Sequence, residues 1–441
     1  MAASVFDSPL FSQLFPTGET GRLFSDSASI RAMLLVEGAL AKAQGQLGLI
    51  PEISAAAIHR ATLEIQIDPG ALAKATGENG VSVPGLVAAF QAEMNAPEHA
   101  QYLHWGATSQ DIIDTGLMLR LRQALTLAEA ELRRVLENLG RQAEAFADLP
   151  MAARTYGQQA TPTSWGAVVA AWGAPLLDAL DALPEVRKYS LWVSLSGATG
   201  TASALGESAP ALRTALADGL GLRDPGRSWH TDRGPLLRIA GWMTQVTAQL
   251  GSMGQTLTGM AATELQEVSL GETGASSTMP QKQNPVGPSV LTALSYQMAG
   301  LTAGLHNATS HQFQRDGACW FTEWMVIPQI ALTCAAALQQ ASALSGTLQP
   351  NAQNMASSLQ SGLGLIHAEK LSFALCAKMP RPAAKNEVRV LCAEVTRTGK
   401  TLAELALAKH SDLPKSLFQP DAQLGQAPAD ALRFAERVRA L

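Results

Sequence analysis

Apolar side chains recur at helical spacing along most of the chain. Between residues 112 and 147, one helix face carries Ile113, Leu117, Leu121, Leu125, Leu127 and Leu132. This pattern is long enough for a helix that crosses a whole bundle. Alanine- and leucine-rich stretches of the same period predict further helices over residues 175–183, 233–266 and 286–308. Strand-like alternation is nearly absent, so we predict an all-α fold.

Proline- and glycine-rich segments divide this helical pattern. Pro51, Pro69-Gly70 and residues 77–84 interrupt the first hundred residues. Loops are predicted at residues 148–150, 157–166 and 194–206, and residues 379–382 break a smaller C-terminal region. We therefore predict a helical N-terminal domain (1–111), a central domain of long helices (112–350) and a helical C-terminal domain (351–441).

The composition favours a protein that buries much of its surface. Of 441 residues, 47% are hydrophobic and only 16% are charged. A chain with so few charges often covers part of its surface in subunit contacts, so we expect an oligomer. The net charge of -5 argues against nucleic acid as the main partner.

No sequence signal points to an oxidising compartment or a membrane. The four cysteines lie far apart without a CxxC pair, which predicts buried thiols and neither disulfides nor a zinc site: Cys319, Cys334, Cys376 and Cys392. The first 15 residues lack the basic and apolar regions of a secretory signal. The apolar stretch 325–338 is too short for a membrane span and contains Gln329. We expect a cytoplasmic protein without a membrane span.

Residues 271–288, GETGASSTMPQKQNPVGP, carry the densest concentration of candidate chemistry. Small residues let the backbone approach a ligand, and Ser276 and Ser277 offer hydroxyl groups. Lys282 supplies a positive charge for an anion, and Asn284 supplies amide donors. The alternative interpretation is a mobile polar connector.

This segment resembles the signature of the fumarase/aspartase superfamily, Gly-Ser-Ser-x-Met-Pro-x-Lys-x-Asn. Residues 275–284 match every defined position except the first, where Ala275 replaces glycine. The resemblance implies a three-domain, all-α fold with a central bundle of long helices. It also implies a cofactor-free homotetramer whose active sites draw on conserved regions from different subunits.

A second stretch, residues 104–115, begins with His104 and contains Thr108-Ser109 just before the long predicted helix. The two hydroxyl residues fit a plain N-cap. They also fit a carboxylate site made of hydroxyls and backbone N–H groups at a helix N-terminus. The stretch is similar to the superfamily's first conserved region, whose Thr-Ser pair binds substrate carboxylate.

A third stretch, residues 154–166, resembles the second conserved region, Arg-Thr-His followed by Gln. Arg154, Thr155 and Gln158 match, whereas Tyr156 stands in place of histidine. In many members that histidine handles protons and is oriented by a glutamate five residues after the signature asparagine. That position is Ser289 here, so both members of the pair are absent.

The absence of both the histidine and the glutamate restricts the reactions that such a site can catalyse. A lyase that expels an amine or hydroxide needs an acid to protonate its leaving group. A carboxylate, with a pKa of about 4, leaves without such help. Lactone formation by intramolecular addition of a carboxylate to an alkene therefore needs only one residue, for the proton at carbon. Ser276 is the remaining candidate, provided that N–H groups and cations stabilise its alkoxide.

One branch of the superfamily performs this reaction on 3-carboxy-cis,cis-muconate in protocatechuate breakdown, the β-ketoadipate pathway. Residues 78–87, 228–233 and 315–324 resemble segments of that branch. Its substrate is a small tricarboxylate, so the site should gather cations and dipoles: Lys282, Asn284, Thr108, Ser109, Thr155, Arg315, His104, Arg154, Tyr156, Gln158 and His230.

Several of these residues have structural alternatives. Arg154 also fits a structural ion pair. Arg233 is expected to pair with Asp232 and not with substrate, and Trp320 and Trp324 are expected in the core or a pocket wall.

Two other functions stay open. One is a lyase of the adenylosuccinate or argininosuccinate type, which releases fumarate, and the missing His–Glu pair argues against it. The other is a structural protein that has lost catalysis, and the intact loop with Ser276 and Lys282 argues against that.

Overall fold

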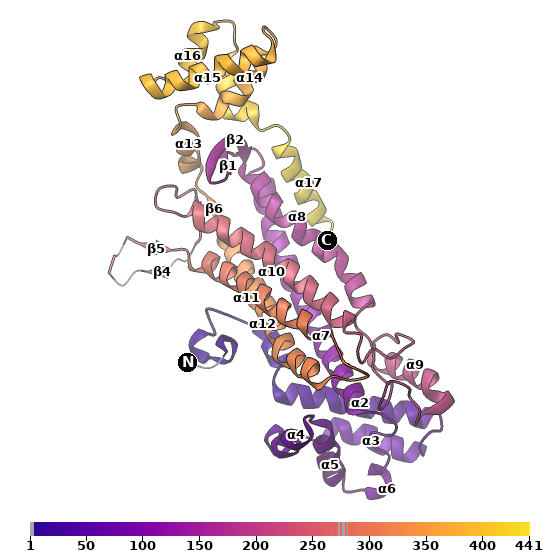
Figure 1. The fold of residues 1–441 in the computed structure, drawn as a ribbon. Helices are drawn as coiled ribbons and strands as arrows, with labels where there is room; N and C mark the ends of the chain where they lie inside the picture. Colours follow the sequence, from indigo (N-terminus) through magenta and orange to yellow (C-terminus); the bar gives the residue numbers. More distant parts are fainter. Residues whose placement is uncertain (1–3, 272–273, 276–277, 280) are drawn as a thin grey trace. The chain divides into compact units, whose positions relative to one another are not determined.

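The structure is a computed structural model that describes residues 4–271, 274–275, 278–279 and 281–441 (Figure 1). Helix accounts for 69% and strand for 5%, which confirms the all-α prediction. Contacts between Cα atoms group the chain into two units, each made of three stretches of sequence. Unit 1 comprises Met1–Ala130, Ala179–Ala248 and Leu294–Gln339. Unit 2 comprises Glu131–Asp178, Gln249–Ala293 and Gln340–Leu441. The three-domain division at residues 111 and 350 stays a prediction.

Long helices contribute residues to both units: α7 (Ser109–Ala145), α8 (Trp165–Lys188), α10 (Gly234–Met260), α11 (Val286–Asn307) and α12 (Gly317–Thr347). The ends predicted from the sequence for α7 and α11 lie within three residues of the observed ends. It placed the start of α8 at Pro175, but the helix begins at Trp165. Because Trp165 and Val169 are buried, their packing favours helix on both sides of the proline.

Unit 1 is built on the packing of α2 (Asp26–Gln46) against α3 (Glu52–Glu64) and α9 (Ala209–Leu220). Gly45 lets α2 approach α3 closely, because an added Cβ would lie 2.4 Å from the Cβ of Ala55. The other short helices of unit 1 are α1 (Gly18–Leu23), α4 (Ala73–Asn79), α5 (Val83–Met94) and α6 (Pro97–Ala100), with 3-10 turns at Val5–Asp7, Pro9–Phe11, Pro69–Leu72 and Gly206–Ser208.

Unit 2 contains a β-hairpin that the sequence did not predict. Strand β1 (Pro150–Thr155) pairs antiparallel with β2 (Gln158–Ser164), and the register shifts between Ala152 and Arg154. The loop predicted at 157–166 is therefore wrong. The turn residues Tyr156 and Gly157 have φ of 53° and 75°, the geometry of a tight two-residue hairpin turn. Two further strand pairs of unit 2 are short: β3 (Val268–Ser269) pairs with β6 (Gln349–Pro350), and β4 (Gly274–Ala275) pairs with β5 (Gln283–Asn284).

The C-terminal part of unit 2 is a cluster of short helices around its own apolar core. Its buried residues include Leu371, Val388 and Leu402. The predicted break at 379–382 is observed, since α15 begins directly after Pro380. The helices are α13 (Ala352–Gln360), α14 (Ala368–Leu375), α15 (Arg381–Thr398), α16 (Leu402–Lys409) and α17 (Ala427–Arg439), with 3-10 turns at Leu365–His367, Lys415–Phe418 and Pro420–Gln423.

Two helices, α8 and α12, are long and apolar enough to cross a membrane by length and composition alone. Of their most apolar windows, 56% and 61% are buried inside the protein, as is typical of core helices. The cysteines are free thiols, but only Cys334 is buried. The prediction of burial is wrong for the other three, which are half-buried.

Candidate active site

The predicted carboxylate-binding residues of unit 1 gather at the N-terminus of α7. Arg315 donates from Nε to Oε1 of Gln110 (2.8 Å) and from a terminal nitrogen to Oγ1 of Thr108 (3.5 Å). Ser109 is the first residue of the 37-residue helix, and both hydroxyl residues are half-buried. A helix N-terminus and a guanidinium both favour an anion. We call Thr108, Ser109, Arg315, His104 and His230 the α7 group.

Asp111 holds this group together. Its carboxylate is fully buried and accepts hydrogen bonds from the backbone N–H groups of Thr108, Ser196 and Gly197 at 2.9–3.1 Å. It also accepts from Oγ of Ser194 at 3.0 Å. Asp111 was not among the residues predicted from the sequence. Its position three residues after Thr108, as in a capping box, was the available signal.

His230 is held by the same carboxylate. Its Nε2 lies 2.8 Å from Oδ1 of Asp111, and its carbonyl accepts from Nε2 of Gln110 at 2.9 Å. With Nε2 donating, a neutral ring presents Nδ1 as an acceptor. That Nδ1 is buried and has no hydrogen-bond partner among the described residues. The structure thus brings His230 into the α7 group, and its role in substrate binding stays a prediction.

His104 pairs with a carboxylate from α2. Its Nδ1 lies 2.7 Å from Oε1 of Glu37, whose side chain is 2% exposed. Burial lowers the pKa of His104, but the hydrogen bond to Glu37 and the charges of Glu37 and Asp111 outweigh it, so its pKa is raised. The protonated ring would add a positive charge near Thr108.

Arg233 belongs to a buried ion-pair triad. Its guanidinium is fully buried and binds Asp114 at 2.8 and 3.1 Å and Glu323 at 2.6 and 2.7 Å. Burial opposes its charge, but the two carboxylates raise its pKa above the ordinary value. The expected partner Asp232 is wrong, since Asp232 pairs with Arg227. The expectation that Arg233 serves structure is supported.

The tryptophans near this triad divide between the two expected roles. Trp320 is 2% exposed and donates from Nε1 to Asp114 at 3.3 Å, so it is a core residue. Trp324 lines a cavity of unit 1.

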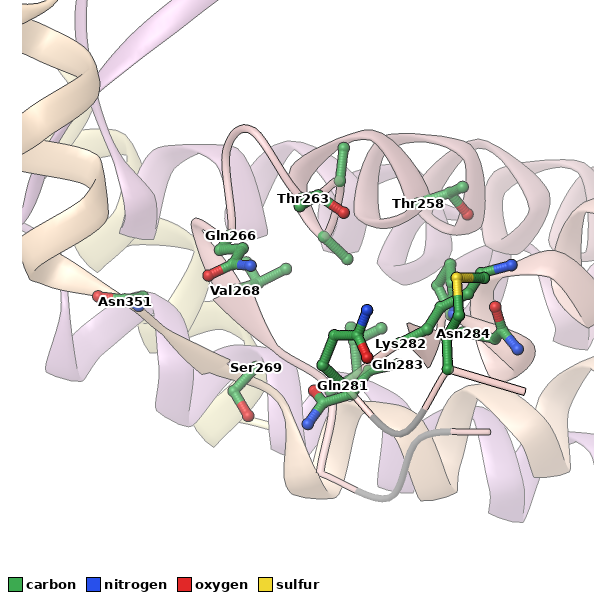
Figure 2. Close-up of a pocket in the computed structure, with 15 residues that line it drawn as sticks. Thr258, Thr263, Gln266, Val268, Ser269, Gln281, Lys282, Gln283, Asn284 and Asn351 are labelled. Carbon is green, nitrogen blue, oxygen red and sulfur yellow. The ribbon is translucent and has the colours of Figure 1, made fainter. Parts of the chain in front are cut away.

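Lys282 and Asn284 line a cavity of about 720 Å³ in unit 2. Figure 2 shows them on one side of it, with Thr258, Thr263 and Gln266 across the opening. Lys282 is the only charged side chain among the described residues that line it. A single ammonium among amides and hydroxyls suits an anionic ligand. The predicted proton carrier Ser276 and its neighbour Ser277 lie outside the described residues.

Arg154 forms the structural ion pair that the sequence left open. Both terminal nitrogens lie 2.7 Å from the oxygens of Glu267, which is fully buried. The carbonyl of Glu267 also accepts from the backbone N–H of Asn351 at 2.8 Å. Glu267 directly precedes β3, so the pair fixes the chain where it enters the signature segment. No local sequence signal identified Glu267.

The remaining hairpin residues lie away from the Lys282 cavity. Thr155 and Gln158 face each other across the turn, both exposed, and the Tyr156 side chain at the tip is fully exposed. Arg154 and Gln158 line a different cavity of unit 2. Within the described residues of this unit, the hairpin and Lys282 therefore do not share a cavity.

Among the described residues, no group of three or more His, Cys, Asp or Glu side chains could hold a metal ion.

The chain is similar to known proteins along nearly its whole length. A family model described as lyase matches residues 16–300. A 3-carboxy-cis,cis-muconate cycloisomerase of Pseudomonas aeruginosa is 37% identical over 95% of this chain and 94% of its own. A crystal structure of a 3-carboxy-cis,cis-muconate lactonizing enzyme from Pseudomonas putida has a TM-score of 0.91 at 33% identity, covering 98% and 99% of the two chains.

More distant relatives carry other names. An N-acetyl-S-(2-succino)cysteine lyase of Enterococcus italicus is 30% identical over 88% of this chain and 86% of its own.

Proposed function

Because the chain belongs to the fumarase/aspartase superfamily of lyases, we propose that it interconverts 3-carboxy-cis,cis-muconate and carboxymuconolactone. This is an intramolecular lyase reaction of protocatechuate breakdown in the β-ketoadipate pathway. Relatives and structural neighbours over most of the chain are muconate cycloisomerases, which supports the proposal.

The observation that carries the proposal is that residues 156 and 289 are a tyrosine and a serine, where many family members have a histidine and a glutamate. The side chain at 156 is a tyrosine at the exposed tip of the β1–β2 hairpin. The hydroxyl of Ser289 donates to the carbonyl of Pro285 in the first turn of α11. The chain therefore lacks, at these two positions, the histidine that a glutamate orients as a proton donor. A carboxylate leaving group needs none, since its pKa of about 4 makes it stable as an anion at neutral pH.

The reaction then needs one proton transfer. In lactonisation a substrate carboxylate oxygen forms a bond to one alkene carbon, and the π electrons of that alkene take up a proton at the neighbouring carbon. In reverse, the proton leaves that carbon and the C–O bond breaks. We assign the proton transfer to Ser276.

The substrate carboxylates are assigned to the cations and dipoles at the two candidate sites. Thr108, Ser109 and Arg315 would bind one at the helix N-terminus. His104 and His230 belong to the same group as these residues. Lys282 and Asn284 would bind another carboxylate, and the hairpin residues Thr155, Tyr156 and Gln158 would complete a site of a different subunit. Arg154 acts through Glu267 and not on the substrate. The proposed active form is a cytoplasmic homotetramer that completes each site with residues from different subunits. No cofactor enters this scheme.

A spectrophotometric assay tests the proposal. Purified protein should change the ultraviolet absorbance of 3-carboxy-cis,cis-muconate and leave the absorbance of plain cis,cis-muconate unchanged.

Lys282→Met should lower kcat/KM about 100-fold, since a charge stabilising an anion is lost. Ser276→Ala should lower kcat. Lys415→Met, at an exposed position on the C-terminal helices, is the matched control. Unchanged absorbance with folded protein, or full turnover by Ser276→Ala, contradicts the proposal.

A second candidate is the release of fumarate from a succinyl thioether, suggested by the name of the Enterococcus italicus relative. A thiolate, with a pKa of about 8.5, also leaves with less help than an amine. Fumarate formed from a succinylated cysteine, with no turnover of the muconate, would favour it. Fumarate release from adenylosuccinate or argininosuccinate would favour the third type of lyase.

A further inference from the structure

The cavity of unit 1 that Trp324 lines is not lined by any residue of the α7 group. It has a volume of about 300 Å³ and lies among residues of α2, α7 and α12. Its walls are mainly apolar and include Phe24, Leu117 and Trp324. Arg120 lines it from α7, twelve residues beyond Thr108, which corresponds to about 18 Å along the helix axis. Arg120 therefore lies more than three helical turns beyond the carboxylate site at the start of that helix.

Arg120 brings an unpartnered positive charge to this cavity. Its Nε is buried without an acceptor, and among the described residues the guanidinium has no ion-pair partner. Its recorded contact is with the ring of Phe24, whose centroid lies 5.6 Å from Cζ. Burial alone lowers the pKa of Arg120 to about 10. Because Nε is buried without an acceptor, a bound anion would supply the missing partner of the half-buried Arg120 side chain.

The other charged groups at the cavity do not act as a counter-ion for Arg120. Glu323 also lines it, but its two oxygens bind Arg233. Asp26 is exposed in the first turn of α2. Neither carboxylate contributes to the pKa of Arg120. The hydroxyls of Ser29 and Thr76 line the cavity and make no hydrogen bond to the described residues. They offer further polar groups to a ligand in the cavity.

We propose that this cavity binds a small aromatic monocarboxylate. The carboxylate would pair with Arg120, and the ring would lie against Phe24, Leu117 and Trp324. The volume is at the lower end of ligand pockets and suits one ring, which excludes a nucleotide. One guanidinium matches one carboxylate, whereas a tricarboxylate would leave two without a cation. The proposal does not depend on the reaction assigned above.

Titration calorimetry of the full chain with benzoate, beside its neutral isostere benzyl alcohol, tests the proposal. Benzoate should bind saturably and raise the Tm, and benzyl alcohol should not. Arg120→Met should weaken benzoate binding at least about 10-fold, since a charge-assisted contact is lost. Its Tm without ligand should not fall, because the half-buried charge that is removed has no ion-pair partner among the described residues. Arg134→Met, at an exposed position of the same helix, should bind benzoate as the wild type does.

Two further variants separate this cavity from the α7 group. Arg315→Gln should keep the benzoate affinity of the wild type. Ser29→Phe should fill the cavity while Arg120 is retained, and it should lose binding to a similar extent, even if Arg120→Met does not fold. The proposal is overturned if the wild type does not bind benzoate. It is also overturned if Arg315→Gln abolishes binding while Arg120→Met retains it.

Discussion

Asp111 and Glu267 are buried carboxylates that position residues predicted to bind substrate. Asp111 binds His230 and the backbone of Thr108, and Glu267 binds Arg154. A buried carboxylate needs several donors, and here backbone N–H groups and cationic side chains provide them. At the residue scale, His230 and Arg154, which were predicted to bind substrate carboxylates, are paired with carboxylates of the protein itself.

The Arg154–Glu267 pair gives a first prediction. Arg154→Met should lower the free energy of unfolding by about 3–5 kcal/mol, because it leaves Glu267 buried without its counter-ion. The double variant Arg154→Met with Glu267→Met should recover most of that loss, as measured by chemical denaturation. If the double variant is no more stable than the single one, the pair does not act as a unit.

The His104–Glu37 pair predicts a pH dependence. Since the folded-state pKa of His104 is raised, its contribution to stability is fully present below the unfolded value of about 6.5. The contribution is lost as the pH rises through the raised pKa. The stability difference between wild type and His104→Gln, followed by denaturation against pH, should therefore shrink above about pH 6.5. A difference that grows with pH contradicts the assignment.

At the scale of elements, the β1–β2 hairpin depends on its turn. Gly157→Ala should lower the stability by about 1 kcal/mol, because φ of 75° strains any residue with a Cβ. Gly219→Ala is the matched control, since a Cβ there meets open space within α9 and should be neutral or stabilising. The Tm values of both variants measure the difference. Equal losses would mean that the turn conformation is not responsible.

The same hairpin shows where local sequence fails. Gly, Gln, Thr and Pro residues between 157 and 166 have the composition of a loop, and their strand pairing is set by partners in β1. Proline misled the prediction in α8, because Pro175 is tolerated where flanking apolar residues are buried. By contrast, α7 and α11 have uninterrupted apolar periods, and the sequence placed both within three residues.

At the scale of the whole molecule, the two groups of candidate residues predict complementation between subunits. Thr108→Ala and Lys282→Ala should each be nearly inactive. When the two variants are unfolded together and refolded, about a quarter of the wild-type activity should return, since random mixing gives that fraction of sites with both native residues from different subunits. A mixture that assembles but stays inactive would mean that one subunit supplies both.

Sequence alone determined the residue types of the candidate site. Lys282, Thr108, Arg315 and His230 were identifiable because their motifs are contiguous in the chain. Their partners were not identifiable, because Asp111 binds His230 from 119 positions away and Arg154 binds Glu267 from 113. Local pattern carries no information on such pairs.

The sequence by itself therefore determined an all-α chain of long helices and its family signature, because helical periodicity and motifs are local properties. Only the tertiary structure decided which charges are free. It paired Arg154 with Glu267 and Arg233 with Asp114 and Glu323, and it left the Nε of Arg120 buried without an acceptor. The physical reason is that the state of a charge depends on burial and on neighbours, which folding brings from distant parts of the chain.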